Sequence, residues 1–236
     1  MILTLLIVAI IIGIFGLAVF GMITSEKKRL ARKKESILAL GFQAIDNPDP
    51  SLLTHLIALY TKRESQKLAL RNFYQRRESE SLLYLYEVWN ESSGDNDLQE
   101  KWGLAIASPY LNLPRFTLIP KIDMTGRLAS LVNRLLEKVT VQGNVKVEFT
   151  DHQQFSSRYL VTGKDESAVR QLFSDRLLKR LSDTSYLQAD GDQNFLTFSK
   201  YDLKRAKQKG KMEDLANRLE EARSFFKLMM EEAAVR

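Results

Sequence analysis

The sequence predicts an α+β protein with an N-terminal transmembrane helix, a mainly antiparallel sheet with packed helices, and a C-terminal amphipathic helix. Three observations indicate this class. Residues 2–23 carry no charge, several runs between residues 67 and 198 alternate apolar and polar side chains, and other segments repeat apolar residues at helical spacing. Strands and helices do not alternate strictly, which favours an antiparallel α+β domain over a doubly wound one.

Composition excludes several classes of chemistry. The 236 residues include no cysteine and two histidines, so disulfides, iron–sulfur clusters, thiol nucleophiles and cysteine zinc sites are excluded. The net charge is +6, but residues 24–35 alone hold six basic and two acidic side chains. Because the remainder is nearly neutral, nucleic-acid binding is not expected. We predict no cofactor and no metal site.

The first element is a membrane span. The 22 residues from Ile2 to Ile23 would cover about 30 Å as a helix, the thickness of a bilayer's hydrocarbon core. A cleavable signal peptide is the alternative, but it would need a positive N-terminal region and a small-x-small cleavage site. Residues 1–24 are therefore predicted to be an uncleaved anchor. Small residues at Ala9, Gly13 and Gly16 would allow another helix to approach closely; the alternative is that they simply face lipid.

A basic collar follows the span, and residues 25–62 are predicted to be a basic, helical juxtamembrane linker. Positive flanks stay cytoplasmic, so we expect the N-terminus outside and residues 25–236 in the cytoplasm. The membrane would be a bacterial inner membrane, or a thylakoid membrane in a cyanobacterium. The collar either serves only as this topology signal or also contacts anionic headgroups. Its members are Lys27, Lys28, Arg29, Arg32, Lys33 and Lys34.

The next elements are helices and then strands. Residues 26–45 have a helical pattern, and Asp49 with Pro50 can begin a short helix that carries His55 as a surface or half-buried residue. Alternation predicts strands at 67–74 and 82–89, joined by a polar turn at 75–79. Further strands are expected at 102–107 and 115–119, with glycine and proline at the turns between them.

The second half of the α+β domain, which we assign to residues 63–200, begins with an amphipathic helix at 128–139. Strands are predicted at 145–149 and 157–162. One helix should start near Asp165 and continue to Leu181. The run Asp190-Gly191-Asp192-Gln193 predicts the turn of a hairpin between 186–189 and 194–198.

Residues 201–236 are predicted to be a basic segment and a C-terminal amphipathic helix. From Met212 onward the spacing is that of a heptad repeat. The helix could pack on its own domain or form a coiled coil with a partner or a second copy. Its inward positions would be Met212, Leu215, Leu219, Ala222, Phe226, Met229 and Ala233.

Motifs for catalysis are incomplete in this sequence. Gly163-Lys164 lacks the earlier glycine and following Ser/Thr of a phosphate-binding loop. Asp190, Asp192 and Asn194 begin like a calcium loop, but the sixth position is Phe195. Asp151-His152 has no nucleophile elbow beside it. No catalytic residue is predicted, and the enzyme class stays open.

Two motifs carry a resemblance to a known group. They are LPRFTLIP at 113–120, and residues 155–173 with the pattern YLVTGxDExAVRxLF. This pair resembles a group of uncharacterised bacterial single-pass membrane-anchored proteins that share a domain of unknown function. The likeness covers roughly residues 80–200. It implies a membrane location and this architecture, and it supplies no catalytic residue.

Three arginines of these motifs are candidate contacts for a small anion or a partner: Arg115, Arg158 and Arg170. The alternative is that they pair with Glu87, Glu148 or Glu166 and stabilise the sheet. Our leading hypothesis is a non-enzymatic membrane-anchored protein that binds a protein partner through its C-terminal helix or a sheet face. The alternatives are an enzyme acting on a membrane-proximal substrate, or a module that binds anionic lipid.

Overall fold

The structure is a computed structural model that describes residues 24–25, 28, 30–59, 68–90, 101–121, 143–184, 187–200 and 215–234. It divides into two units, Met1–Phe42 and Gln43–Arg236. In the first unit, residues 30–39 are helical. The predicted span at 2–23 lies outside the described residues, and no helix within them is long and apolar enough to cross a membrane.

The helix of the first unit ends at residue 39, earlier than the predicted end at residue 45. It ends in a Schellman motif, in which the N–H of Phe42 donates to Ile37 and the N–H of Gly41 donates to Leu38. Gly41 has a φ of 81°, a left-handed conformation that glycine adopts without a steric penalty. The glycine therefore ends the helix, and the chain continues into a strand.

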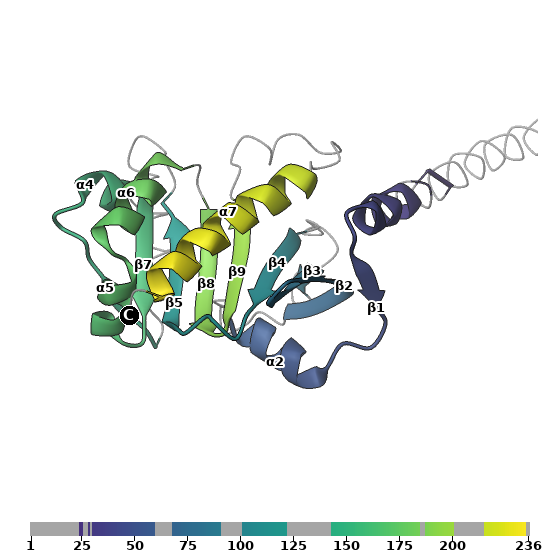
Figure 1. The fold of residues 1–236 in the computed structure, drawn as a ribbon, viewed down its shortest axis with the longest axis horizontal. Coiled ribbons are helices and arrows are strands. Elements are labelled where there is room, and N and C mark those ends of the chain that lie inside the picture. Colours follow the sequence, from purple (N-terminus) through teal and green to yellow (C-terminus); the bar gives the residue numbers. More distant parts are fainter. Residues whose placement is uncertain are drawn as a thin grey trace, which may run out of the picture. The chain divides into compact units, whose positions relative to one another are not determined.

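The second unit is built on one antiparallel sheet in the order β1-β2-β3-β4-β9-β8-β5-β7-β6 (Figure 1). Its strands are β1 (Gln43–Ile45), β2 (Leu68–Glu78), β3 (Ser81–Asn90), β4 (Lys101–Ala107), β5 (Leu113–Pro120), β6 (Val145–Val147), β7 (Tyr159–Gly163), β8 (Leu187–Gln193) and β9 (Phe195–Lys200). The antiparallel α+β class is therefore confirmed.

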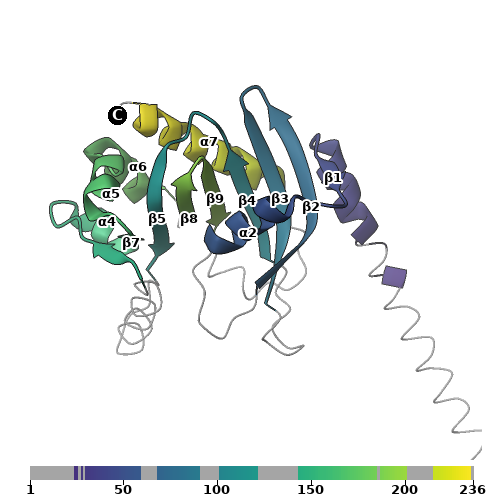
Figure 2. The ribbon, with the colours of Figure 1, turned by 90° about the horizontal axis from the view of Figure 1, so that it is seen from below.

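Helices cover both faces of this sheet (Figure 2). The helices among the described residues of the second unit are α2 (Pro50–Leu59), α4 (Gln153–Arg158), α5 (Glu166–Leu172), α6 (Asp175–Asp183) and α7 (Leu215–Ala234). Leu56 and Leu59 of α2 pack with Tyr84 and Ala105, and Ala105 is paired with Thr197. The neighbouring Phe198 contacts Phe225 of α7, with ring centroids 6.0 Å apart. Because successive strand residues face opposite sides, α2 and α7 lie on opposite faces.

The α7 helix crosses the sheet (Figure 1). Polar side chains of α7 bind the end of β2 at one point and the start of α6 at another. Arg223 pairs with Glu78 at the end of β2, and Glu232 accepts a 2.6 Å hydrogen bond from Ser174, the N-cap of α6. The predicted C-terminal helix is confirmed, and its buried apolar residues pack within the chain. These are Leu219, Ala222, Phe225, Leu228 and Met229.

The predicted linker 25–62 is too long, because part of it belongs to the folded unit. The β1 strand pairs with β2 from Gln43↔Gln75 to Ile45↔Phe73. Leu56 and Leu59 are fully buried in the core under α2. Residues 43–59 are thus part of the second unit.

The predicted turn at 75–79 is wrong, since Gln75, Arg76, Arg77 and Glu78 continue β2. They pair in turn with Tyr84, Leu83, Leu82 and Ser81 of β3, and the two-residue turn is Ser79-Glu80. Ser79 has a φ of 33°. The polar run is typical of a loop, but here it is the end of a strand whose partners Leu83 and Tyr84 are buried.

The predicted turn at Asp190–Gln193 is also wrong, because Asp190, Gly191 and Asp192 lie within β8. The pair Asp192↔Phe195 closes a two-residue turn at Gln193-Asn194, and Gln193 has a φ of 53°. A Cβ at Gly191 would lie 2.2 Å from Cε1 of Phe116. The glycine is therefore required for packing and does not form the turn.

Two further boundaries differ from the prediction. Residues 157–158 end the short helix α4, and the strand begins only at Tyr159. The helix predicted from Asp165 to Leu181 is two helices, since Ser174 accepts a hydrogen bond from the N–H of Leu177 and starts α6. Such a side-chain cap satisfies an N–H that would otherwise lack an acceptor. The helix predicted at 128–139 and the basic segment before α7 lie outside the described residues.

Candidate functional site

Arg115, the first candidate arginine, caps a helix. It lies on β5, and its Nη2 donates to the carbonyl oxygens of Ala58 at 2.6 Å and Leu59 at 2.9 Å. Carbonyls of the last helical turn have no partner within the helix, so this guanidinium stabilises the C-terminus of α2.

Arg158 caps a second helix. Its Nη1 donates to Ser182 at 2.6 Å and its Nη2 to Thr184 at 2.8 Å, at the end of α6. Main-chain hydrogen bonds place Arg158 beside Lys121 and Arg115 beside Lys164, at opposite ends of the β5–β7 pair. Six residues from Arg115 to Lys121, at about 3.3 Å each, separate them by roughly 20 Å. The structure therefore does not bring these two arginines together.

Arg170 lies on the exposed side of α5 and adjoins a pocket. Its Nε and Nη2 donate to Oε1 of Glu166 one helical turn away, so this arginine forms one of the ion pairs that the sequence suggested. Its guanidinium carbon is 5.5 Å from the ring centroid of Phe149, and Phe149 lines the pocket.

The edge pocket, as we name it, is a cavity of about 230 Å³ between β6, the end of β7 and α4. Its apolar wall is buried and aromatic, with Phe155 stacked on Tyr159 at 5.3 Å and perpendicular to Phe149 at 5.5 Å. This wall consists of Val147, Phe149, Phe155, Tyr159, Leu160 and Val161. The volume is below the range usual for drug-sized ligands but suits one apolar side chain.

Cations surround the edge pocket. Lys121 donates to the carbonyl of Ser156 at 2.6 Å, and Lys146 pairs with Glu148 at 3.0 Å; all four residues line the pocket. The hydrogen bond from Lys146, aided by the charges of Lys121 and Arg170, lowers the pKa of Glu148. Three cations thus act on one carboxylate, which makes the site attractive to a further anion. Sequence reasoning did not select Lys121 or Lys146, because only the fold brings them together.

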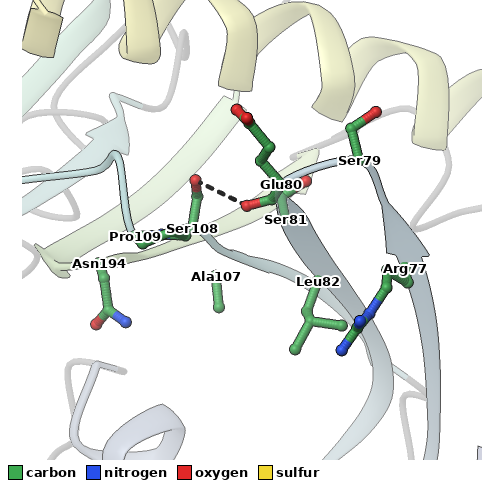
Figure 3. A pocket seen from close by; sticks show the side chains of 9 residues that line it. All are labelled: Arg77, Ser79, Glu80, Ser81, Leu82, Ala107, Ser108, Pro109 and Asn194. Atoms are coloured by element: carbon green, nitrogen blue, oxygen red, sulfur yellow. Dashed lines mark hydrogen bonds between the residues drawn. The ribbon is translucent and has the colours of Figure 1, made fainter.

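A second cavity, of about 300 Å³, lies where the β2–β3 and β8–β9 turns meet the end of β4 (Figure 3). Arg77, Leu82, Ala107 and Asn194 project to the same side, and the carboxylate of Glu80 points away from them. Its wall is largely apolar with one guanidinium. Such a wall could contact an apolar group of a ligand, and Arg77 supplies one positive charge.

Ser108 is the buried hydroxyl of this second cavity. Its Oγ donates to the carbonyl of Glu80 at 3.3 Å and accepts from the N–H of Tyr110 (Figure 3). A serine nucleophile needs an adjacent general base to take its proton. Here the proton is directed at a main-chain carbonyl, so the arrangement stabilises the β4–β5 turn.

Asp190 is a buried carboxylate within a strand, although its sequence predicts a turn. It is 1% exposed and accepts a 2.7 Å hydrogen bond from Thr117, while Thr197 lies on its other side with a 3.4 Å hydrogen bond. Burial raises its pKa to about 6, against the opposing hydrogen bonds and the charge of Arg115. The run from Leu187 alternates apolar and polar residues, and this alternation is the one signal in the sequence that places Asp190 in a strand. The Asp-Gly pair gives a stronger signal for a turn.

The collar residues are partly described. Lys28, Arg32 and Lys34 are exposed and Lys33 is half-buried, while Lys27 and Arg29 lie outside the described residues. Leu30 and Leu38 on the same helix are 46% and 45% exposed.

Each of the two histidines contacts another side chain of the fold. His152 lies 2.9 Å from Asp175 at the start of α6, and the ring of His55 packs 4.5 Å from that of Phe195. In the part of the chain that the structure describes, no group of three or more histidine and acidic side chains could hold a metal ion.

Comparison with known proteins gave no relative: no family model, curated protein or solved structure matched this chain.

Proposed function

We propose that the protein is a non-enzymatic, single-pass membrane protein whose α+β domain faces the cytoplasm and binds a protein partner at the inner membrane. The observation that carries the proposal is the uncharged stretch from Ile2 to Ile23 followed directly by six basic residues. This order is typical of an anchor with its N-terminus outside. The resemblance that the motifs at 113–120 and 155–173 suggest would imply the same location.

The binding role is supported by how the domain uses its polar groups. Arg115 and Arg158 are engaged at helix ends, and the hydroxyl of Ser108 is engaged in a turn. The edge pocket combines a preformed apolar wall with several cations at its margin. This combination suits recognition of another polypeptide more than transformation of a substrate.

The anchor is tested in bacterial membranes with the full chain fused at Arg236 to green fluorescent protein or to alkaline phosphatase. We expect the chain to stay in the pellet after carbonate extraction, with a fluorescent green fusion and an inactive phosphatase. A matched variant, Ile11→Lys with Phe15→Lys, should be extracted, because charge at the centre of a span is costly. Carbonate extraction of the unmodified chain, or an active phosphatase, would overturn the proposal.

The partner is sought with a photo-crosslinking amino acid at exposed positions of the domain, followed by mass spectrometry. We expect one protein to be crosslinked repeatedly from positions on a single face. Crosslinks spread evenly over all faces, with no recurrent protein, would contradict a binding role.

A second role, contact of the collar with anionic lipid, is favoured by the exposure of Arg32, Lys34 and Leu38 on one helix. Cations near a membrane surface each contribute about 1 kcal/mol of binding free energy. If the role is real, Arg32→Gln with Lys34→Gln should reduce crosslinking of the full chain to a photoreactive phosphatidylserine. Unchanged crosslinking would contradict it.

A further inference from the structure

The edge of the sheet is incomplete beside the edge pocket. On one side, β5 pairs with all five residues of β7, from Tyr159 to Gly163. On the other side, β6 pairs only with Val161, Thr162 and Gly163. Tyr159 and Leu160 line the pocket, so the cavity lies where the edge strand stops short of the end of its neighbour.

The pocket also adjoins the outer edge of β6. Within the described residues, β7 is the one strand that pairs with β6. Val145 on this edge strand is 48% exposed, whereas Val147, two residues on, is buried in the pocket wall. An extended segment lying along β6 would place one side chain against Val145 and another in the pocket. Main-chain pairing gives such strand addition its affinity, and side-chain pockets give it specificity.

The charges at this edge select the added segment. Lys121, Lys146 and Arg170 act on Glu148, and Glu166 pairs with Arg170, so among these five side chains the cations outnumber the carboxylates by three to two. An acidic segment is favoured by this surplus. A second copy of the chain is disfavoured, because two β6 edges would bring Lys146 close to its own equivalent.

We propose that the edge pocket and the outer edge of β6 bind an extended acidic segment of a partner protein. The segment inserts one apolar side chain beside Phe149 and Phe155, and its carboxylates lie near Lys121, Lys146 and Arg170. This inference rests on the proposed partner-binding function and names the chemistry of that partner.

The test uses the full chain in nanodiscs of zwitterionic lipid and a labelled heptapeptide that alternates aspartate or glutamate with valine. Fluorescence anisotropy should show saturable binding of this peptide, and empty nanodiscs should show none. A peptide with lysine in place of each acidic residue should bind at least about tenfold more weakly. Hydrogen exchange of Val145–Val147 should slow when the acidic peptide is bound.

Matched variants separate this site from general charge and from misfolding. Lys146→Glu should weaken binding by about tenfold, whereas Lys227→Glu, on an exposed lysine of α7 away from the pocket lining, should change it less than about twofold. Thr150→Trp adds bulk at the exposed margin of the pocket and should also weaken binding by about tenfold, unlike Gln154→Trp on the exposed side of α4. Circular dichroism verifies that each variant is folded.

The proposal is overturned if the acidic and basic peptides bind alike, if Lys146→Glu and Thr150→Trp leave the affinity unchanged, or if exchange at β6 stays fast in the complex. These results would leave the anchor and the crosslinked partner intact. Failure of the proposed function would show itself separately, in the carbonate extraction and in the crosslinking.

Discussion

Asp190 is a carboxylate placed where its ionised form is unfavourable. It is buried in β8, and two threonine hydroxyls compensate for only part of the lost hydration. Its pKa rises from 3.8 to about 6 in the folded chain. The folded state therefore binds an extra proton between these pH values, and stability from this residue falls as the pH rises through 6.

We expect Asp190→Asn to stabilise the protein at pH 7, because the variant has no buried negative charge. The difference in the free energy of unfolding should reach at most about 3 kcal/mol at pH 7 and shrink toward pH 4. Urea unfolding of both full chains across this range measures it. A difference that stays constant from pH 4 to pH 7 would show that folding does not shift the pKa of Asp190.

The sequence could not reveal the role of Asp190, because its neighbours gave a stronger and contrary signal. Asp-Gly favours a turn on local preference alone. The environment is supplied by Thr117, 73 residues away, and by Phe116, whose ring occupies the space above Gly191. Local preference is overridden whenever such distant contacts are worth more than the turn.

Gly191 shows that distant packing also determines the sequence of an element, the strand β8. Its missing side chain leaves room for Phe116, whose ring packs against Phe173 at 5.3 Å. We expect Gly191→Ala to lower the free energy of unfolding by about 3 kcal/mol, because the methyl group would overpack a filled core. Urea unfolding, followed by tryptophan fluorescence, provides the measurement.

Gly143→Ala is the control for this substitution. Gly143 has a φ of 78°, and no heavy atom lies within 4 Å of the position that an added Cβ would occupy, so the variant tests backbone strain without a clash. Its cost should be about 1 kcal/mol. The double variant Gly191→Ala with Phe116→Leu should recover part of the loss. Equal costs for the two glycines would contradict the packing argument.

At the scale of elements, periodicity predicted the strands β3, β4 and β5 and the helix α7 well. Each strand has a run of apolar residues at strand spacing, and α7 has a run at helical spacing. The single helix predicted from Asp165 failed at Ser174, where a side-chain cap starts α6. Its apolar spacing continues through the break, so the pattern alone could not show it. The edge pocket was not predictable either, since Lys121, Lys146 and Arg170 come from three separate segments.

The order of strands in the whole sheet lies beyond what alternation can provide. Alternation assigns the faces of a strand but does not identify its neighbours. In this chain the C-terminal hairpin β8–β9 inserts between β4 and β5, which are consecutive in the sequence. The α7 helix then spans this junction, bound to Glu78 on one side and to Ser174 on the other.

The register of α7 provides the last prediction, because a heptad and a straight helix bury different phenylalanines. A strict heptad places Phe226 inward, but a helix with 3.6 residues per turn drifts from that repeat. In the structure Phe225 is buried against Phe198, and Phe226 is half-buried. We therefore expect Phe225→Ala to lower the free energy of unfolding by about 3 kcal/mol and Phe226→Ala by roughly 1 kcal/mol. Urea unfolding of the full chain distinguishes them, and a larger cost at Phe226 would indicate that the helix uses its heptad face instead.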